Sequence, residues 1–560
     1  MFLALELCLS AICLAFAYTR PPLGDQFFAP FERRFAAYAN RRVAAVVTVG
    51  ALALGIRLAL LPILPIPVPE IHDEFSHLLL ADTLAHGRLA NPTHPMWIHF
   101  ETFHVNWHPT YASMYFPGQG IFLAFGQVIL GHPFWGVWLS SGLMCAAICW
   151  ALQGWMPPSW ALLGGLLALI RLGTFSYWAD SYWGGAVTAL GGALVIGAYP
   201  RIKNNQKVFD SILLGLGMVL LALSRPYEGA FFCVPVVIAL VVWAVRQKSR
   251  PWGLLLKRVA LPSMLLLVAG LTWLAFYFWR VTGSPFTTPY QVNMRTYGLI
   301  YFPWERMKMV PTFHHEVMRL FYRDITLTRD YNFAHKHLLR LQALKILPVW
   351  LFYFGPLLTI PWLAWLGTRR RGVFFKEISP HLRFLLLVCL TTWVSIMLTI
   401  YVGQPHYAAP LTATFYVATM LVMRDLRFSS SGRWLVRSIA LVAGGLFLAA
   451  LVSRSAHLVD RPSWVRIWCT PTFQNLQRAQ VLNQLQQMPG QQLAIVRYQP
   501  HHDFAYDEWV FNGADIDGSK VLWARDMGQQ NTELLNYFKN RQAWLVEPDY
   551  HPAKLSKYVR

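Results

Sequence analysis

Charged side chains are scarce in this chain of 560 residues. Asp, Glu, Lys and Arg make up 13% of it, whereas about 25% is usual in soluble proteins. Hydrophobic residues make up 55%, and many form uninterrupted runs close to the ~20 residues that cross the hydrocarbon core of a bilayer. These features exclude an ordinary soluble protein and predict an all-α polytopic membrane protein.

Acidic residues are the rarer of the two charged classes. The chain has 27 Asp and Glu against 48 Lys and Arg, for a net charge of +21. In a soluble protein this excess would suggest a nucleic-acid partner. Here much of the positive charge falls in short connections between apolar runs, which is typical of cytoplasmic loops, so we exclude nucleic-acid binding. The basic connections are residues 19–42, 200–208, 246–258, 368–383 and 424–437.

Cysteine is also sparse, and its placement excludes two kinds of site. Six of the seven cysteines lie within apolar runs, and only Cys469 falls in a region expected to be soluble. There is no CxxC pair and no cysteine spacing typical of a zinc site. We therefore expect neither a disulfide framework nor a cysteine-ligated metal. The sequence also lacks internal repeats and low-complexity segments.

The apolar runs predict about 11–13 transmembrane helices. The first run lacks a basic start and contains Glu6, which indicates an anchor or a first span rather than a cleaved signal peptide. Whether it crosses the membrane stays open. The runs are residues 1–18, 43–66, 135–152, 159–174, 182–199, 209–224, 229–245, 259–279, 346–367, 384–402, 409–423 and 438–453.

The positions of the basic connections predict the topology. If those connections are cytoplasmic, loops 67–134 and 280–345 and the tail 454–560 lie on the opposite side. We expect a membrane domain over 1–453 and a small extracytoplasmic α/β domain over 454–560. In the tail, the pattern predicts strands at 491–498, 507–512, 519–526 and 542–549 and an amphipathic helix at 531–541.

Two adjacent carboxylates, Asp73 and Glu74, follow the apolar run 43–66. The leucines after them recur at helical spacing and Gly87 is a plausible stop, so we expect a short amphipathic helix on the membrane surface. Two interpretations remain open. The acids either cap the helix and complement its dipole, or they carry chemistry at the membrane boundary, where charge is costly.

Histidines are dense around and after these acids. They could hold a metal ion, although His104 and His108, with HxxxH spacing, are followed directly by Pro109. Alternatively they belong to an interfacial belt together with the aromatic residues. The histidines are His72, His77, His86, His94, His99, His104 and His108.

Further polar residues fall in the turns on the same predicted side. Asp180 lies among aromatic residues at the start of a span, where an isolated acid needs a partner or a task. Arg225 and Glu228 flank a turn and either pair with each other or leave the arginine for a phosphate. Arg280 starts a large loop, and His406 is a lone histidine in a late turn.

The order of these motifs resembles the GT-C fold glycosyltransferases, in particular the protein-mannosyltransferase and aminoarabinose-transferase-like branch (glycosyltransferase family 39-like). The similarity rests on DEFSHLLLADTLAHGRL at 73–89, on FPGQG at 116–120 with the run after it, and on HYAAP at 406–410. Two departures leave donor and acceptor open: Pro-Gly stands where Pro-Pro is usual, and Trp138 stands where an arginine is common.

The resemblance implies roles for these residues. Asp73 would be the catalytic acid/base, with Glu74 supporting it or helping to hold a cation, and Asp180 would be a secondary acid. A divalent ion is a candidate cofactor that not every branch requires, and its candidate ligands would be Glu74 and His77. The residues expected to bind substrate are Tyr115, Arg225, Glu228, Arg280, His406 and Tyr407.

The implied activity is inverting transfer of a hexose or pentose from a polyprenyl-phosphate donor to a protein, lipid or glycan acceptor. It would take place on the outer face of a bacterial inner membrane, with the tail in the periplasm. One alternative is a transporter or flippase for a lipid-linked glycan, which should carry polar groups near the bilayer midplane; Arg57 and Arg171 are the candidates. Another is a non-catalytic envelope assembly protein.

Overall fold

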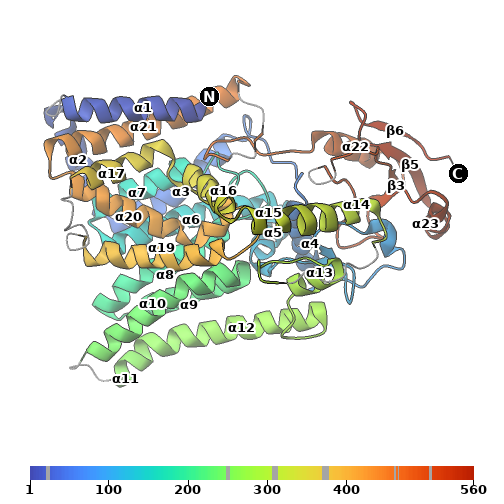
Figure 1. Cartoon of the computed structure of the whole chain (residues 1–560), viewed down its shortest axis with the longest axis horizontal. Helices are drawn as coiled ribbons and strands as arrows, with labels where there is room; N and C mark the ends of the chain where they lie inside the picture. The colour runs from blue at the N-terminus through green and yellow to red at the C-terminus, as the bar shows by residue number, and fades with distance from the viewer. Residues whose placement is uncertain are drawn as a thin grey trace.

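The protein is a long helical body with a small sheet domain at one end (Figure 1). The computed structural model describes residues 1–19, 25–247, 252–305, 313–368, 378–458, 462–463, 466–503 and 507–559. The prediction of an all-α polytopic body followed by a C-terminal α/β domain is confirmed.

Each predicted apolar run falls mainly on a helix of the body. Six helices are long and apolar enough to cross a membrane, or seven if a bent pair counts as one span, and four further apolar helices are shorter. The body helices are α1 (Phe2–Thr19), α2 (Asp25–Ala39), α3 (Arg42–Ala59), α6 (Phe134–Trp155), α7 (Pro158–Leu172), α8 (Ala186–Asn205), α9 (Val208–Ser224), α10 (Pro226–Arg246), α11 (Trp252–Leu255), η2 (Leu256–Ala260), α12 (Leu261–Thr282), α16 (Leu338–Tyr353), α17 (Gly355–Gly367), α19 (Pro380–Met397), α20 (Thr412–Leu426) and α21 (Ser430–Ser455).

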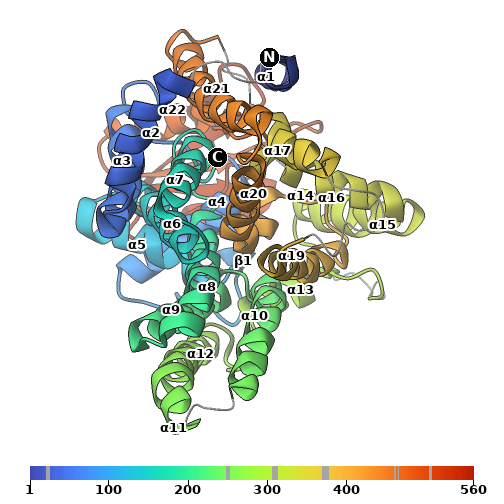
Figure 2. The ribbon, with the colours of Figure 1, turned by 90° about the vertical axis from the view of Figure 1, so that its left-hand side faces the viewer.

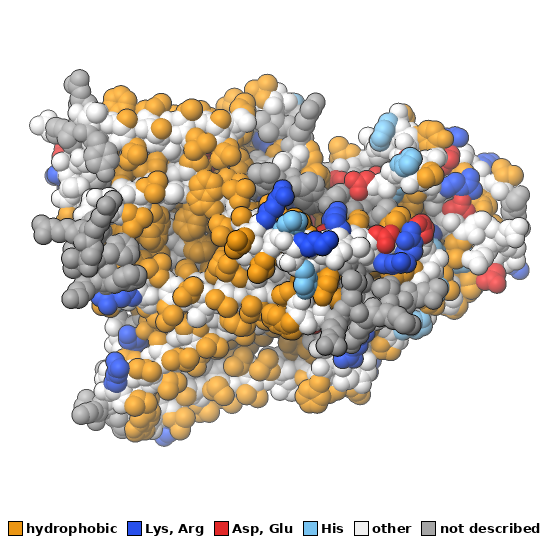
Figure 3. All heavy atoms as spheres, in the orientation of Figure 1, with side chains coloured by type: hydrophobic (Ala, Val, Ile, Leu, Met, Phe, Trp, Pro, Cys, Tyr) orange, Lys and Arg blue, Asp and Glu red, His pale blue; other side chains and the backbone are white. Residues whose placement is uncertain are grey.

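Basic connections that are far apart in sequence meet at one end of the body. Arg427 donates to Glu32 of α2 at 2.6 Å, and Arg437 donates to the same carboxylate at 2.9 Å. Arg437 also donates to Asp25. The sheet domain lies at the opposite end (Figures 1 and 3). This arrangement agrees with the charge-based prediction that the basic connections share one side.

The predicted span over 346–367 is not one straight helix. The chain bends there by 96° between α16 and α17. Gly355 lies at the break with φ +54°, and a Cβ on it would lie 2.3 Å from Nη2 of Arg171. Glycine is therefore required at this turn, because a side chain has no room and the left-handed conformation is strained for other residues.

A buried ion pair satisfies the backbone groups that this break exposes. Arg171 donates to the carbonyl oxygens of Leu351 and Phe352, each at 2.9 Å, and pairs with Glu6 at 3.1 Å. Glu6 in turn accepts from the backbone N–H of Leu357 at 3.2 Å. Because unpaired backbone groups cost several kcal/mol in hydrocarbon, the pair makes the bent helix tolerable.

The loops at the sheet-domain end are themselves folded. Residues 67–134 form two helices of 14 residues each, with a short antiparallel hairpin between them. The described residues of loop 280–345 include a set of short helices. The elements are α4 (His72–Ala85), η1 (Trp97–Phe100), β1 (Val105–Asn106), β2 (Ala112–Ser113), α5 (Pro117–Leu130), α13 (Pro289–Tyr297), α14 (Glu316–Arg319), η3 (Leu320–Asp330), α15 (Tyr331–Lys336) and, after α19, η4 (Pro405–Leu411).

The tail folds into a four-stranded sheet with strand order β4-β3-β5-β6. The strand β3 is parallel to β4 and β5, and β6 is antiparallel to β5. The elements are α22 (Leu476–Gln487), β3 (Gln491–Val496), β4 (Val521–Arg525), η5 (Gly528–Gln530), α23 (Asn531–Tyr537), β5 (Arg541–Glu547) and β6 (Lys554–Lys557).

The strand predicted at 507–512 is wrong. This segment is irregular, because its carbonyl oxygens bind a side chain instead of a neighbouring strand. Arg478 donates to the carbonyl of Trp509 at 2.9 Å and to that of Phe511 at 3.1 Å. Its apolar side chains are still used, since Trp509 and Phe511 are both buried.

Loss of the Glu6 carboxylate should destabilise the body. Glu6→Gln leaves the Arg171 guanidinium buried without its counter-charge, and breaking a buried pair in this way costs about 3–5 kcal/mol. We expect a clear drop in the apparent melting temperature in detergent micelles, followed by intrinsic fluorescence. Glu316→Gln is the matched control, because Glu316 is exposed in its pair with Arg319 and exposed ion pairs contribute little to stability. Equal shifts for both variants would contradict the role given to Glu6.

Candidate functional site

A cavity of about 440 Å³ opens where the body meets the folded loops. Its wall comes from α4, α5, the segment before α8, the start of α10, α13 and η4. Seven of the ten residues selected from the sequence line it: Asp73, His77, Tyr115, Arg225, Glu228, His406 and Tyr407. The other three, Glu74, Asp180 and Arg280, lie elsewhere.

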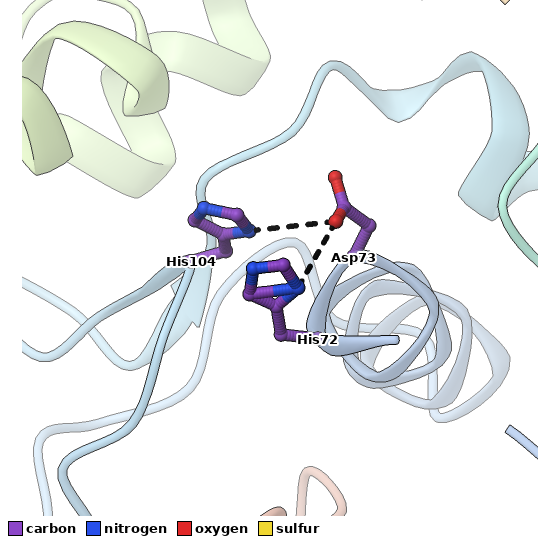
Figure 4. A group of neighbouring side chains, drawn as sticks. All are labelled: His72, Asp73 and His104. Carbon is purple, nitrogen blue, oxygen red and sulfur yellow. Dashed lines mark ion pairs between the residues drawn. The ribbon is translucent and has the colours of Figure 1, made fainter. Parts of the chain in front are cut away.

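Asp73 lies in the first turn of α4 with both carboxylate oxygens engaged. The Tyr115 hydroxyl donates to Oδ1. Oδ2 faces two imidazoles, with His72 Nδ1 at 3.2 Å and His104 Nδ1 at 3.9 Å (Figure 4). Burial alone would raise the pKa of Asp73, but the His104 and His72 imidazoles and the Tyr115 hydrogen bond hold it well below its usual range. Asp73 is therefore a carboxylate at neutral pH.

The group His72, Asp73 and His104 could hold a metal ion. One ligand atom from each lies within 4.8 Å of the others. Burial lowers the pKa of His72 to about 3 and also lowers that of His104, so both imidazoles are neutral, as metal ligation requires. Two imidazoles and a carboxylate suit Zn²⁺. The sequence pointed to Glu74 and His77 as ligands, and neither belongs to this group.

Glu74 joins α4 to the turn before α8. Its Oε2 accepts from the backbone N–H of Glu70 at 3.2 Å and of Ile71 at 3.1 Å, and its Oε1 accepts from Tyr182 N–H at 2.9 Å. Burial raises the pKa of Glu74 to about 7. Of the two adjacent acids it is Glu74 that satisfies the helix N-terminus, which leaves Asp73 to face the cavity.

Asp180 has a partner in the membrane body. It pairs with Arg57 at 3.1 Å, and both side chains are buried. Arg57 also donates to the carbonyl of Leu64 at 2.8 Å, which fixes the chain just before α4. The two arginines that a transporter would use at the midplane, Arg57 and Arg171, are thus both engaged with acids and carbonyls.

Arg225 and His406 lie on the cavity wall with defined orientations. Arg225 pairs with Glu228 at 2.8 Å and lies over the Tyr407 ring at 4.4 Å. The Tyr177 hydroxyl donates to Nδ1 of His406 at 3.0 Å. The same hydroxyl oxygen accepts a hydrogen bond from the backbone N–H of His406 at 3.1 Å. Arg280, in contrast, is exposed over Trp279 and does not reach the cavity.

Aromatic rings line much of the cavity, and the sequence did not single most of them out. Trp183, Tyr290, Tyr301 and Phe302 join Tyr407 on the wall. Tyr290 and Tyr301 come from loop 280–345, whose path over the site is set by tertiary packing. Their only signal in the sequence was the concentration of aromatic residues on one predicted side.

A second, apolar groove of about 790 Å³ lies between α9, α10 and α12, and Figure 2 shows where these three helices lie. Its lining is almost entirely aliphatic and aromatic, from Leu214 to Leu271. Pro226 borders both this groove and the polar cavity. The charged cavity therefore lies beside an apolar surface of membrane helices.

The tail contributes to the site as well. The guanidinium of Arg466 lies over the rings of Tyr177 and Trp183, 4.6 Å from each centroid. The Phe511 ring stacks on Phe75 of α4 at 4.3 Å. The sequence missed Arg466, which follows the last body helix without a recognisable motif.

No protein-family model matches the chain, and no curated protein matches it in sequence. Several solved structures, in contrast, resemble the chain in fold. The archaeal oligosaccharyltransferase AglB from Archaeoglobus fulgidus, in complex with an inhibitory peptide and a dolichol-phosphate, aligns with a TM-score of 0.51 at 11% identity, over 90% of this chain and 69% of that one. The apo form of the enzyme gives 0.50 at 10% identity over the same shares.

The transferase ArnT from Cupriavidus metallidurans, bound to undecaprenyl phosphate, aligns at a TM-score of 0.47 with 12% identity, over 89% of this chain and 92% of that one. At such low identities the AglB alignments establish the fold and nothing more. The expected GT-C fold is confirmed.

We expect the wild-type protein to bind one Zn²⁺ or Mn²⁺ ion through His72, Asp73 and His104, measured by titration calorimetry on metal-stripped protein. His104→Ala should weaken binding by more than the roughly tenfold that loss of a supporting residue costs. His77→Ala is the matched control, since His77 lies one turn along the same helix but outside the group. Equal losses in the two variants, or no binding by the wild type, would refute this ligand set.

Proposed function

We propose that this protein is a membrane glycosyltransferase that moves a hexose or pentose from a polyprenyl-phosphate donor to an acceptor hydroxyl. The observation that carries the proposal is the juxtaposition at Pro226 of a polar cavity holding Asp73 and an apolar groove between membrane helices. A substrate with a sugar phosphate at one end and a prenyl chain at the other matches both surfaces.

The donor fits these surfaces in one orientation. The prenyl chain lies in the groove between α9, α10 and α12, where burial of apolar surface favours it at roughly 25 cal/mol per Å². Its phosphate then lies near Arg225, at the start of α10. The planar guanidinium of this arginine suits phosphate oxygens. The same-fold AglB was captured with a dolichol-phosphate, which supports a carrier of this class.

Asp73 acts as the general base. Its carboxylate accepts the proton of the acceptor hydroxyl, the freed oxygen forms a bond to the anomeric carbon, and the bond from that carbon to the phosphate oxygen breaks. Attack from the side opposite the phosphate inverts the anomeric centre. Arg225 stabilises the negative charge on the departing polyprenyl phosphate, and the aromatic wall holds the sugar by packing against its C–H faces.

A divalent ion fits the site as a supporting group. His72, His104 and Oδ2 of Asp73 would hold it, and when bound it would supply positive charge next to the donor phosphate. The protein residues orient the carboxylate independently of the ion, since the Tyr115 hydroxyl fixes Oδ1.

The charge pattern supports a reaction on the side of the membrane opposite the cytoplasm. The basic connections would face the cytoplasm, so the cavity and the tail would face the periplasm of a bacterial inner membrane. The acceptor is a protein, lipid or glycan presented on that side.

The proposal predicts which lipid co-purifies with the protein. Asp73→Asn removes the base while keeping the shape of the side chain, so donor should accumulate unreacted. We expect mass spectrometry to find a polyprenyl-phosphate sugar on the variant and sugar-free polyprenyl phosphate, or no lipid, on the wild type. The mass also names the sugar.

Asp517→Asn is the matched control, since Asp517 is an exposed tail residue, and it should behave as the wild type. An intact multi-sugar lipid on every sample would favour the flippase alternative. Absence of polyprenyl lipid from all samples would remove the basis for the donor assignment.

A further inference from the structure

We propose that Gln119 and His77 recognise hydroxyl groups of the transferred sugar and so set which sugar the protein accepts. This inference rests on the proposed function and names the residues that determine sugar specificity within it. Both residues line the cavity that holds Asp73. Each also carries a buried polar atom that has no hydrogen-bond partner within the described chain.

Gln119 lies in the first turn of α5, and its side chain is held on one side only. Nε2 donates to the carbonyl of Tyr182 at 3.3 Å. Oε1 has no partner among the described residues, although Gln119 is only 7% exposed. Gly184 lets the chain pass close by, because a Cβ there would lie 3.1 Å from the Gln119 amide. The amide is therefore fixed with an unused acceptor.

His77 lies one helical turn after Asp73 on α4, which brings its ring to the same side of the helix. Its imidazole stacks on Tyr115 with centroids 4.5 Å apart and planes at 26°, and Tyr115 is the residue that donates to Asp73. His77 is 8% exposed, and its Nδ1 has no partner in the described chain. The ring is thus positioned beside the base by stacking alone.

The chemistry of the Gln119 Oε1 atom fits a sugar hydroxyl and not a phosphate, and the His77 Nδ1 atom can donate to or accept from a hydroxyl, depending on the tautomer. An amide oxygen can only accept a hydrogen bond, so it needs a donor, and a phosphate oxygen of the donor offers none at neutral pH. Sugar hydroxyls both donate and accept. A buried polar atom without a partner is destabilising, and a sugar hydroxyl in the right position supplies the missing hydrogen bond. A sugar that lacks this hydroxyl, or carries it in the opposite configuration, leaves the buried atom without a partner.

A site built in this way discriminates strongly, because the wrong sugar leaves its buried polar groups unpaired. The aromatic wall packs on any sugar ring and gives little choice between stereoisomers. Arg225, which pairs with Glu228 at 2.8 Å, is assigned to the donor phosphate. Among the cavity residues that the structure describes, Gln119 and His77 are the two with a buried side-chain polar atom that has no hydrogen-bond partner.

The test compares sugar preference in three purified variants with the wild type. The probes are farnesyl phosphates carrying glucose, galactose, mannose or xylose. Gln119→Leu keeps the size of the side chain and removes the acceptor; His77→Phe keeps the stacking ring and removes the nitrogens. His86→Phe is the matched control, because His86 lies at the exposed end of the same helix. The readout is the ratio of kcat/KM between sugars, which does not depend on the fraction of folded enzyme.

We expect the wild type to prefer one sugar, and Gln119→Leu and His77→Phe each to lower that preference by roughly tenfold, while His86→Phe leaves it unchanged. Loss of activity in equal proportion for every sugar would overturn the inference and leave both residues with a structural role. An unchanged preference would overturn it as well. If the wild type transfers none of the four sugars, the proposed function itself fails and this inference falls with it.

Discussion

The constraint on which this structure depends is that hydrocarbon offers no partner to a polar group. The break between α16 and α17 shows how the described body meets this constraint. The 96° break between α16 and α17 frees carbonyls and an N–H, and Arg171 and Glu6 bind both sets while neutralising each other. Buried pairs of this kind contribute little net stability. This pair instead allows the chain to bend inside the body, because it binds the backbone groups that the bend leaves without partners.

A second pair extends this logic to the site. Arg57 holds both Asp180 and the carbonyl of Leu64, so the turn before α8 and the chain before α4 are tied to one buried guanidinium. Glu74 then binds the Tyr182 N–H of that turn. The Asp73 carboxylate is thus positioned by a connected set of polar contacts that begins inside the membrane. Its low pKa, caused by the imidazoles and Tyr115 despite burial, is the chemical result of that positioning.

The sequence predicted what depends on local pattern and could not predict what depends on contacts between distant segments. The apolar runs predicted the helices of the membrane body. The positions of the basic residues predicted that the connections between those helices lie on one side of it. Asp73 was selected because an acid at a membrane boundary is unusual, and it lines the cavity. Asp180 was selected for the same reason, and its partner Arg57, 123 residues earlier, could not be paired with it from spacing. The strand expected at 507–512 failed because Arg478 takes its carbonyls.

The helix expected on the membrane surface shows how the tail enters the argument. The helix forms, but it is buried on several sides and is not an amphipathic surface helix. Leu79 shares a core with Leu493 and Ile495 of β3, and Phe75 stacks on Phe511, while Leu80 packs with Leu223 and Leu274 of the membrane helices. Asp82 extends the contact by accepting from the Ala514 N–H at 2.7 Å and from Gln127 of α5 at 2.9 Å. One helix thus carries the catalytic candidate on one side and the tail on the other. Because the tail packs directly on the helix that carries Asp73, the tail supports the position of that carboxylate together with the membrane helices.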